Sequence, residues 1–185
     1  MKITLLRHGK PDFKIPKRTS SKEIVDLVKN YDKAGIASDS LPPPSSIEMA
    51  NNVNIIICSH LPRSLESAQK LTQQPIYLSD ALFREANLPS SNGSFPKLPA
   101  TLWLIIYRFL WLLGYAKNAE SIVITRQRAR QATEKLIELV QQHQHILLVG
   151  HGVFNYLIAK ELTKTGWKSS KKSPRKHWEY TSYEI

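Results

Sequence analysis

Four basic side chains follow apolar stretches of the chain, and their types suit the chemistry of a phosphate group. They are Arg7, His8, Arg63 and His151. A guanidinium group offers planar, paired donors to phosphate oxygens, and an imidazole can act as a nucleophile or as a hydrogen-bond donor. Gly9 follows His8 and lets the backbone turn sharply or approach a ligand closely. An Arg-His-Gly triplet is common, so a site here requires that the fold bring Arg63 and His151 beside it.

The apolar stretches that precede these side chains predict buried strands. Strands are expected over residues 2–7, 53–58 and 145–150, because each stretch is short, continuous and apolar. The carboxyl ends of parallel strands lie along one edge of an open α/β sheet, where ligands bind. The four basic side chains are therefore expected along one rim of the sheet.

Helical patterns alternate with these strands, which predicts an α/β fold. Helices are expected over 62–71 and 153–162, and Pro62 suits a first helical turn. A further short strand is expected over 75–78, and the alternation over 177–185 is typical of an edge strand. The predicted architecture has three layers, α/β/α, with a mostly parallel central sheet.

Three more helices are expected outside this strand–helix alternation. The first begins near Ser20 and Glu23, which have the spacing of a capping box, and ends before Gly35. A short helix is expected over 47–51 and a long one over 121–143. The apolar stripe of the long helix comprises Ala129, Ala132, Leu136, Ile137 and Val140, and its solvent side comprises Arg126, Arg128, Arg130 and Lys135.

The composition indicates a globular, strongly basic protein. The 185 residues include 26 Lys or Arg and 15 Asp or Glu, a formal charge of +11, and 42% are hydrophobic. One domain over 1–185 is expected, with a sizeable core. The single cysteine, Cys58, excludes an internal disulfide and is expected to be a core thiol in a reducing compartment. Because Arg7 and His8 interrupt the first apolar segment, no signal peptide is expected, and the predicted location is cytoplasmic.

The densest basic segment runs from Lys160 to Lys176. It contains Lys164, Lys168, Lys171, Lys172 and Arg175 and little acid. It is interpreted either as a solvated loop or as a contact for nucleic acid, acidic lipid or a polyanionic substrate. Specific nucleic-acid binding is not expected, because no aromatic-rich RNA-binding signature or helix-turn-helix signal accompanies it.

Residues 101–115 form the most apolar segment. It is short for a membrane span, and Arg108 stands at its middle, so a buried helix or a hydrophobic lid is expected. A weak peripheral membrane contact through Trp103 and Trp111 is the alternative.

Four short motifs together resemble the histidine phosphatase superfamily, the phosphoglycerate-mutase-like proteins. They are LLRHGKP at 5–11, SHLPRSLESA at 59–68, LFRE at 82–85 and LLVGHG at 147–152. Their order, spacing and predicted strand context match the pattern of the family and span the α/β core. The resemblance implies the phosphoglycerate-mutase-like fold and a phosphorylated substrate.

The resemblance also implies a role for each matching residue. His8 resembles the nucleophile that becomes phosphorylated, and Glu85 resembles the proton donor. Arg7, Arg63 and His151 resemble the phosphate pocket, with His151 also taking part in catalysis. Glu66 and Glu120 are alternative acids.

The implied reaction is the hydrolysis of a phosphomonoester through a phosphohistidine intermediate. The attacking nitrogen of His8 must be neutral, and the other nitrogen is expected to donate to a carbonyl in the Gly9 turn. A neutral Glu85 would protonate the leaving oxygen and later accept a proton from water. No cofactor and no metal are expected, because the histidines lack ligand-spaced carboxylates or cysteines.

The sequence departs from the family pattern beside the first motif. Pro11 and Lys14 stand where many members have a small polar residue and an asparagine, and Lys14 or Lys10 is a candidate substitute contact to phosphate. Residues 86–120 lack the glycine-and-tryptophan pattern of the mutases and are interpreted as a divergent helical cap. The short chain also favours a phosphatase. A phosphomutase and a non-catalytic phospho-ligand-binding protein are the alternatives, and the substrate and oligomeric state are left open.

Overall fold

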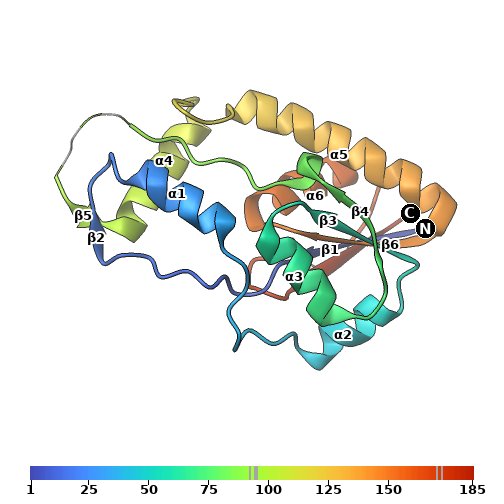
Figure 1. Ribbon diagram of the computed structural model, residues 1–185. Coiled ribbons are helices and arrows are strands. Elements are labelled where there is room, and N and C mark those ends of the chain that lie inside the picture. The colour runs from blue at the N-terminus through green and yellow to red at the C-terminus, as the bar shows by residue number, and fades with distance from the viewer. Residues whose placement is uncertain (92, 94–95, 170, 172) are drawn as a thin grey trace. The chain divides into compact units, whose positions relative to one another are not determined.

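The computed structural model describes residues 1–91, 93, 96–169, 171 and 173–185 (Figure 1). The chain forms two compact units. The first contains residues 1–12, 35–85 and 128–185, and the second contains residues 13–34 and 86–127. His8, Arg7, Arg63, Glu85 and His151 all belong to the first unit.

The first unit is built on a mixed five-stranded sheet with the order β4-β3-β6-β1-β7. Its strands are β1 (Lys2–Arg7), β3 (Ile55–Ser59), β4 (Ile76–Asp80), β6 (His145–Gly150) and β7 (Tyr180–Glu184). Strand β6 pairs in parallel with both β1 and β3, and β4 is parallel to β3. Strand β7 pairs antiparallel with β1 and forms one edge. The prediction of a mostly parallel sheet in an α/β fold is confirmed.

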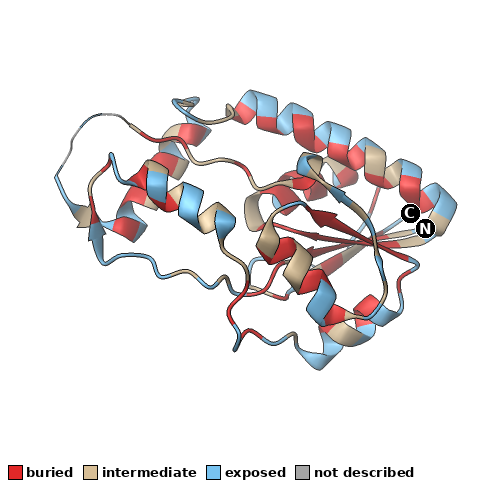
Figure 2. Cartoon of the chain, viewed as in Figure 1, coloured by how far each residue is buried: buried red, intermediate tan, exposed pale blue. Residues whose placement is uncertain are grey.

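Helices cover both faces of this sheet (Figure 1). Helices α2 (Pro44–Asn51) and α3 (Pro62–Leu71) lie on one face, and α6 (Gly152–Lys164) and most of α5 (Ile122–His143) lie on the other. The central strands are buried, whereas the outer sides of the helices are exposed (Figure 2). Both sheet faces are therefore shielded from water, which explains why the parallel strands have continuous apolar sequences.

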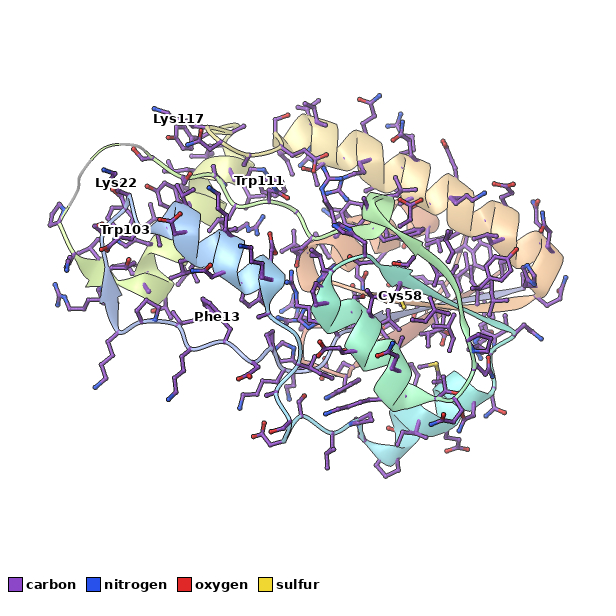
Figure 3. All side chains as sticks on the ribbon, viewed as in Figure 1. Phe13, Lys22, Cys58, Trp103, Trp111 and Lys117 are labelled. Carbon is purple, nitrogen blue, oxygen red and sulfur yellow. The ribbon has the colours of Figure 1, made fainter. Side chains whose placement is uncertain are left out.

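Cys58 lies inside this core, as predicted (Figure 3). Burial raises the pKa of its thiol to about 12, so the thiol stays protonated near neutral pH.

The second unit has a small core of its own. It consists of helices α1 (Ile24–Lys33) and α4 (Ala100–Leu112) and a two-stranded ribbon of β2 (Arg18–Thr19) and β5 (Leu98–Pro99). Ile24 packs with Trp103 and Tyr107 of α4. The segment predicted to be a cap, 86–120, falls within this unit, and its role as a cap stays a prediction.

Helix α4 is buried on one side only. Trp103, Tyr107 and Trp111 are buried, whereas Ile105 is 65% and Phe109 is 59% exposed. Among the described residues, no helix combines the length and the hydropathy that crossing a membrane requires.

Several predicted boundaries are wrong by a few residues. Helix α2 begins at Pro44 rather than at residue 47, because a proline is well accommodated at the first helical position. Glu23 bonds back to the Ser20 N–H at 2.7 Å, but no side chain caps α1, which begins only at Ile24. Strand β7 starts at Tyr180 rather than at residue 177, because Trp178 has a left-handed backbone conformation that does not fit a strand.

The prediction that Arg128 faces solvent is wrong. Its side chain is buried, whereas Arg126 and Arg130 of the same helix are exposed. Arg128 is buried because its guanidinium donates to the backbone carbonyls of Leu82 and Arg84 and lies over the ring of Phe154. These partners are distant in sequence and leave no local pattern.

Candidate active site

His8 directly follows β1 and is 2% exposed. Its backbone N–H donates to the carbonyl of Gly150, the last residue of β6, at 3.0 Å. Its Nδ1 lies 2.7 Å from the carbonyl oxygen of Gly9, the bond expected from the sequence. Because a carbonyl only accepts, Nδ1 carries the proton, and Nε2 of the neutral ring presents a lone pair.

The turn at Gly9 is held from two sides. Its N–H donates to the Ser67 hydroxyl of α3 at 2.8 Å. On the other side the Trp178 indole packs so closely that a Cβ on Gly9 would lie 2.4 Å from a ring carbon. Glycine is therefore required here for close packing against Trp178. The sequence suggested a close approach of the Gly9 backbone to a ligand; the structure shows a close approach to the Trp178 side chain.

Arg63 stands in the first turn of α3, directly after Pro62, and is fully buried. The neighbouring Ser64 hydroxyl donates to the carbonyl of Val149 in β6 and fastens this helix end to the sheet. A helix N-terminus favours anions through its unpaired N–H groups, and a buried guanidinium adds a full positive charge. This end of α3 therefore suits an anionic group.

His151 follows β6 and is the N-cap residue of α6. It is 0% exposed, and its ring centre lies 5.1 Å from that of His8. Neither of its ring nitrogens has a hydrogen-bond partner among the described residues, and the same is true of the buried Nε of Arg7. Buried polar atoms without partners are costly in free energy, so these atoms are suited to a polar ligand.

Burial lowers the pKa of both central histidines well below the usual value. For His8 the charge of Arg63 lowers the pKa further. The hydrogen bond to the Gly9 carbonyl raises it by less than Arg63 lowers it, and the charges of His177 and Arg7 lower it by smaller amounts. For His151 burial has the largest effect on the pKa, and the charges of His8, Arg63 and Arg7 lower the pKa further. Both rings are therefore neutral at pH 7, the state that a nucleophilic imidazole requires.

Glu85 lies after β4 and a short 3-10 helix, η1 (Ala81–Phe83). Its Oε1 accepts the N–H of Phe154 at 2.9 Å, and its Oε2 accepts the N–H of Val153 at 3.3 Å. These donors belong to the first turn of α6, directly after His151. The structure therefore brings Glu85 to the same strand ends as the predicted phosphate-binding residues.

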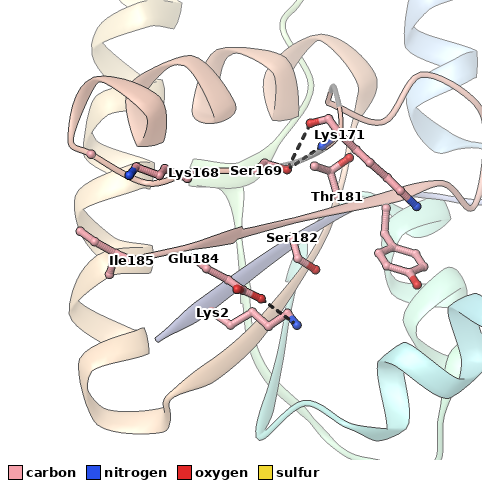
Figure 4. Close-up of a pocket in the computed structure, with 10 residues that line it drawn as sticks. Lys2, Lys168, Ser169, Lys171, Thr181, Ser182, Glu184 and Ile185 are labelled. Carbon is pink, nitrogen blue, oxygen red and sulfur yellow. Dashed lines mark hydrogen bonds and ion pairs between the residues drawn. The ribbon is translucent and has the colours of Figure 1, made fainter.

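A cavity of about 440 Å³ opens beside this cluster. Arg7, Glu85, Gly152 and Val153 contribute to its lining, together with Tyr156 and residues 173–175. A larger hollow of about 760 Å³ lies at the amino end of β1, where it is lined by Lys2 and Glu184 (Figure 4). None of the predicted site residues lines that hollow.

His177 also belongs to the cluster, although no motif indicated it. Its Nδ1 lies 3.1 Å from the backbone carbonyl oxygen of His8, and the two ring centres are 5.4 Å apart. Burial, followed by the charge of Arg7, lowers the pKa of His177. A lone histidine before an edge strand carries no sequence signal, so only the fold reveals it.

The two lysines predicted as substitute phosphate contacts stay untested. The Lys10 amine is exposed and lies 3.8 Å from the Asp39 carboxylate. Lys14 is exposed and belongs to the second unit. Lys172 of the basic segment lies outside the described residues.

No group of three or more His, Cys, Asp and Glu side chains in the described part of the chain is arranged to hold a metal ion. The site is instead defined by two arginines and two neutral histidines, with a carboxylate beside them, at the strand ends of an α/β sheet. This arrangement has the charge and the unpaired donors that suit an anion bound beside two histidines.

The chain belongs to the histidine phosphatase superfamily (branch 1), whose family model matches residues 3–185. The resemblance found in the sequence is thereby confirmed. Comparison with curated protein sequences finds no significant match.

Solved structures of phosphatases share the fold. A mycobacterial glucosyl-3-phosphoglycerate phosphatase has 19% identity and a TM-score of 0.59, covering 88% of this chain and 79% of its own. A putative alpha-ribazole-5'-P phosphatase from Escherichia coli has 20% identity and a TM-score of 0.57, covering 86% and 78%. A phosphoserine phosphatase from Entamoeba histolytica, solved with 3-phosphoglyceric acid, has 18% identity and a TM-score of 0.55, covering 88% and 80%.

Proposed function

We propose that this protein is a phosphatase that hydrolyses a phosphomonoester through a phosphohistidine on His8. The observation that carries the proposal is the pair of buried rings, His8 and His151. The His8 ring is held by Gly9 with Nε2 as its lone-pair nitrogen, and the His151 ring nitrogens have no partner among the described residues. A phosphate group between them would accept from His151 while Nε2 of His8 attacks its phosphorus.

The first step transfers the phosphoryl group to the protein. Nε2 of His8 forms a bond to phosphorus, and the bond from phosphorus to the leaving oxygen breaks. The leaving oxygen takes a proton from the Glu85 carboxyl. Both Glu85 oxygens accept one N–H from α6. A carboxyl oxygen has two lone pairs, so it can carry a proton while it accepts such a bond.

The second step returns the protein to its starting state. The Glu85 carboxylate takes a proton from water as the water oxygen attacks phosphorus, and the bond to Nε2 breaks. Inorganic phosphate leaves, and His8 is neutral again. The same carboxyl group therefore acts first as an acid and then as a base.

Positive charge around the phosphoryl group supplies the main stabilisation. In phosphoryl transfer, charge spreads over the three equatorial oxygens, and catalysis depends chiefly on positioning and electrostatics. Arg7 and Arg63 supply this charge in a largely buried site, where it acts strongly. The same charges oppose protonation of His8 and so keep it nucleophilic.

The test is a rapid-quench reaction with a labelled phosphomonoester. The expected result is an acid-labile, alkali-stable label on His8, with release of inorganic phosphate. His8→Ala should abolish both label and turnover. His145→Ala is the matched control, because His145 lies at the opposite end of β6 from His151.

The other outcomes each assign a different function. Transfer of the label to another hydroxyl without phosphate release would identify a mutase. Binding of phosphate or vanadate without turnover over many phosphomonoesters would identify a non-catalytic phospho-ligand-binding protein. Turnover that survives in His8→Ala would overturn the proposed mechanism.

A further inference from the structure

A basic groove adjoins the cavity beside the candidate site. The groove has a volume of about 830 Å³ and is lined by Lys160, Lys164, Lys168, Lys171 and Arg175, among other residues. Tyr156, Ser173 and Arg175 line both this groove and the cavity that contains Arg7 and Glu85. The two hollows therefore adjoin one another along these residues, and both belong to the first unit.

The groove concentrates positive charge that the protein leaves largely uncompensated. No carboxylate lines it in the described part of the chain. Lys164 pairs with Glu161 at 2.6 Å, and the Lys160 amine lies 4.8 Å from the centre of the Tyr156 ring. Lys168 and Lys171 have no ion-pair partner among the described residues. Clustered like charges repel one another, so an anionic ligand would lower the free energy of this surface.

A buried hydroxyl group marks the junction of the two hollows. The Ser173 Oγ is buried and has no hydrogen-bond partner among the described residues. The adjoining Arg175 carbonyl accepts Nη1 of Arg7, which links this loop directly to the candidate phosphate site. The Glu179 carboxylate accepts the N–H groups of Arg175 and Lys176 at 3.1 and 2.8 Å and holds the loop in this conformation.

Helix α6 sets the distance between the two sites. Val153 lines the cavity beside the candidate site, and Tyr156, Lys160 and Lys164 follow at intervals of three or four residues on one side of the helix. Lys160 lies roughly 10 Å along the helix axis from Val153, at 1.5 Å per residue. A ligand that reaches both places is the size of a small metabolite, and the groove has the volume of a small-molecule pocket.

We propose that this groove binds a second phosphate group of the substrate, so that the preferred substrate is a small molecule with at least two phosphates. This inference rests on the proposed phosphatase function. One phosphate, a monoester, occupies the site at His8, and the other lies among Lys160, Lys171 and Arg175. The body of the molecule passes over the exposed ring of Tyr156.

The experiment compares two pairs of probes on the purified full-length protein. Turnover is measured with hexanediol monophosphate and hexanediol bisphosphate, which share one carbon chain and the same type of scissile group. Because the bisphosphate carries two such groups, kcat/KM is expressed per scissile group. Binding is measured calorimetrically with orthophosphate and tripolyphosphate. The expected result is a kcat/KM about tenfold higher for the bisphosphate, and a Kd about tenfold lower for tripolyphosphate, because several cation–phosphate pairs form together.

Two matched double variants distinguish an effect of the groove from an effect of the net charge of the protein. Lys160→Gln with Lys171→Gln should remove most of both preferences. Arg130→Gln with Lys135→Gln removes the same charge from the outer side of α5 and should leave both preferences in place. Circular dichroism and urea unfolding establish that each variant is folded.

Three outcomes would overturn the proposal. The first is equal kcat/KM for the two hexanediol phosphates, with turnover that depends on His8; the proposed function would then stand without the subsite. The second is an equal loss of the two preferences in both double variants, which would show that the preferences depend only on the net charge of the protein. The third is stronger competition by anionic vesicles or single-stranded oligonucleotides than by tripolyphosphate. Conversely, tripolyphosphate binding that depends on the groove, with no turnover of these or of many other phosphomonoesters, would reject the phosphatase and keep the anion site.

Discussion

The guanidinium of Arg128 lies over the ring of Phe154, with its central carbon 3.9 Å from the ring centre. Both residues hold Glu85. Nη1 of Arg128 donates to the carbonyl oxygens of Leu82 and Arg84 at 2.8 and 3.0 Å, and the Phe154 N–H donates to Oε1 of Glu85 at 2.9 Å. The conformation of the segment that carries the proposed acid is thus determined by a buried arginine on a helix distant in sequence.

Replacing this arginine is therefore expected to misplace Glu85. Arg128→Lys keeps a charge but loses the planar fork and the stacking on Phe154, so we expect the free energy of unfolding to fall by about 2 kcal/mol. We also expect kcat to fall about tenfold, and more steeply for substrates with poor leaving groups, because these depend most on protonation.

Urea unfolding and kcat over a series of aryl phosphates measure the two effects. Arg130→Lys on the exposed side of α5 is the control and should change neither. A variant that is destabilised but keeps the leaving-group dependence of the wild type would show that Arg128 acts on stability alone.

The contact between Gly9 and Trp178 predicts a steric effect at the candidate site. Gly9→Ala would place a Cβ 2.4 and 2.7 Å from two carbons of the indole, which is buried and cannot move freely. We expect a loss of about 2 kcal/mol in the free energy of unfolding, the usual range for overpacking. In a double-mutant cycle, the double variant Gly9→Ala with Trp178→Leu should lose less unfolding free energy than the sum of the losses in the two single variants. Simple additivity would contradict the contact.

The bond from His177 to the His8 carbonyl predicts a positioning role. His177→Ala removes the donor, and we expect kcat to fall a few-fold because the backbone beside the nucleophile is less well held. His177→Asn offers an amide N–H near the same place and should restore most of kcat.

The pH profile distinguishes this role from general stability. The charge of His177 lowers the pKa of His8, so its removal should raise that pKa and shift the acid limb of kcat/KM toward neutral pH. Both variants should show the shift, since neither carries the imidazole. If the acid limb of kcat/KM stays at the wild-type pH in both variants, His177 does not influence the pKa of His8.

The buried neutral histidines predict that the protein loses stability in acid. The pKa values of His8 and His151 are lowered in the folded state, so between their usual value, about 6.5, and the lowered value the unfolded chain binds more protons. Stability is thus full above about pH 6.5 and falls below it, by up to about 1.4 kcal/mol per pH unit for each histidine.

Urea unfolding at a series of pH values measures this slope. His151→Asn removes one titrating group, so its slope below about pH 6.5 should be smaller than that of the wild type. Arg130→Gln, at an exposed residue of α5, should keep the wild-type slope. Equal slopes in the wild type and in His151→Asn would contradict the lowered pKa of His151.

The strands and the candidate site were largely predictable from the sequence because their signals are local. Continuous apolar runs mark strands buried on both faces, and β1 and β6 begin and end at the predicted residues. In a parallel sheet the carboxyl ends of the strands share one edge, so Arg7, Arg63 and His151 were expected together. The hydrogen bond from His8 to Gly9 also follows from adjacent residues.

The remaining features depend on contacts between residues distant in sequence, which local patterns do not encode. Arg128 was assigned to solvent because a charged side chain is ordinarily exposed, and the carbonyls that reverse this preference are more than forty residues away. Trp178 has a φ of 65°, although it is not a residue typical of turns. Because of this conformation, β7 begins later in the chain than predicted. The sequence by itself thus determined the strands and the residues at their ends. The tertiary structure decided what surrounds those residues, because burial, hydrogen-bond partners and hollows arise only when separate elements pack together.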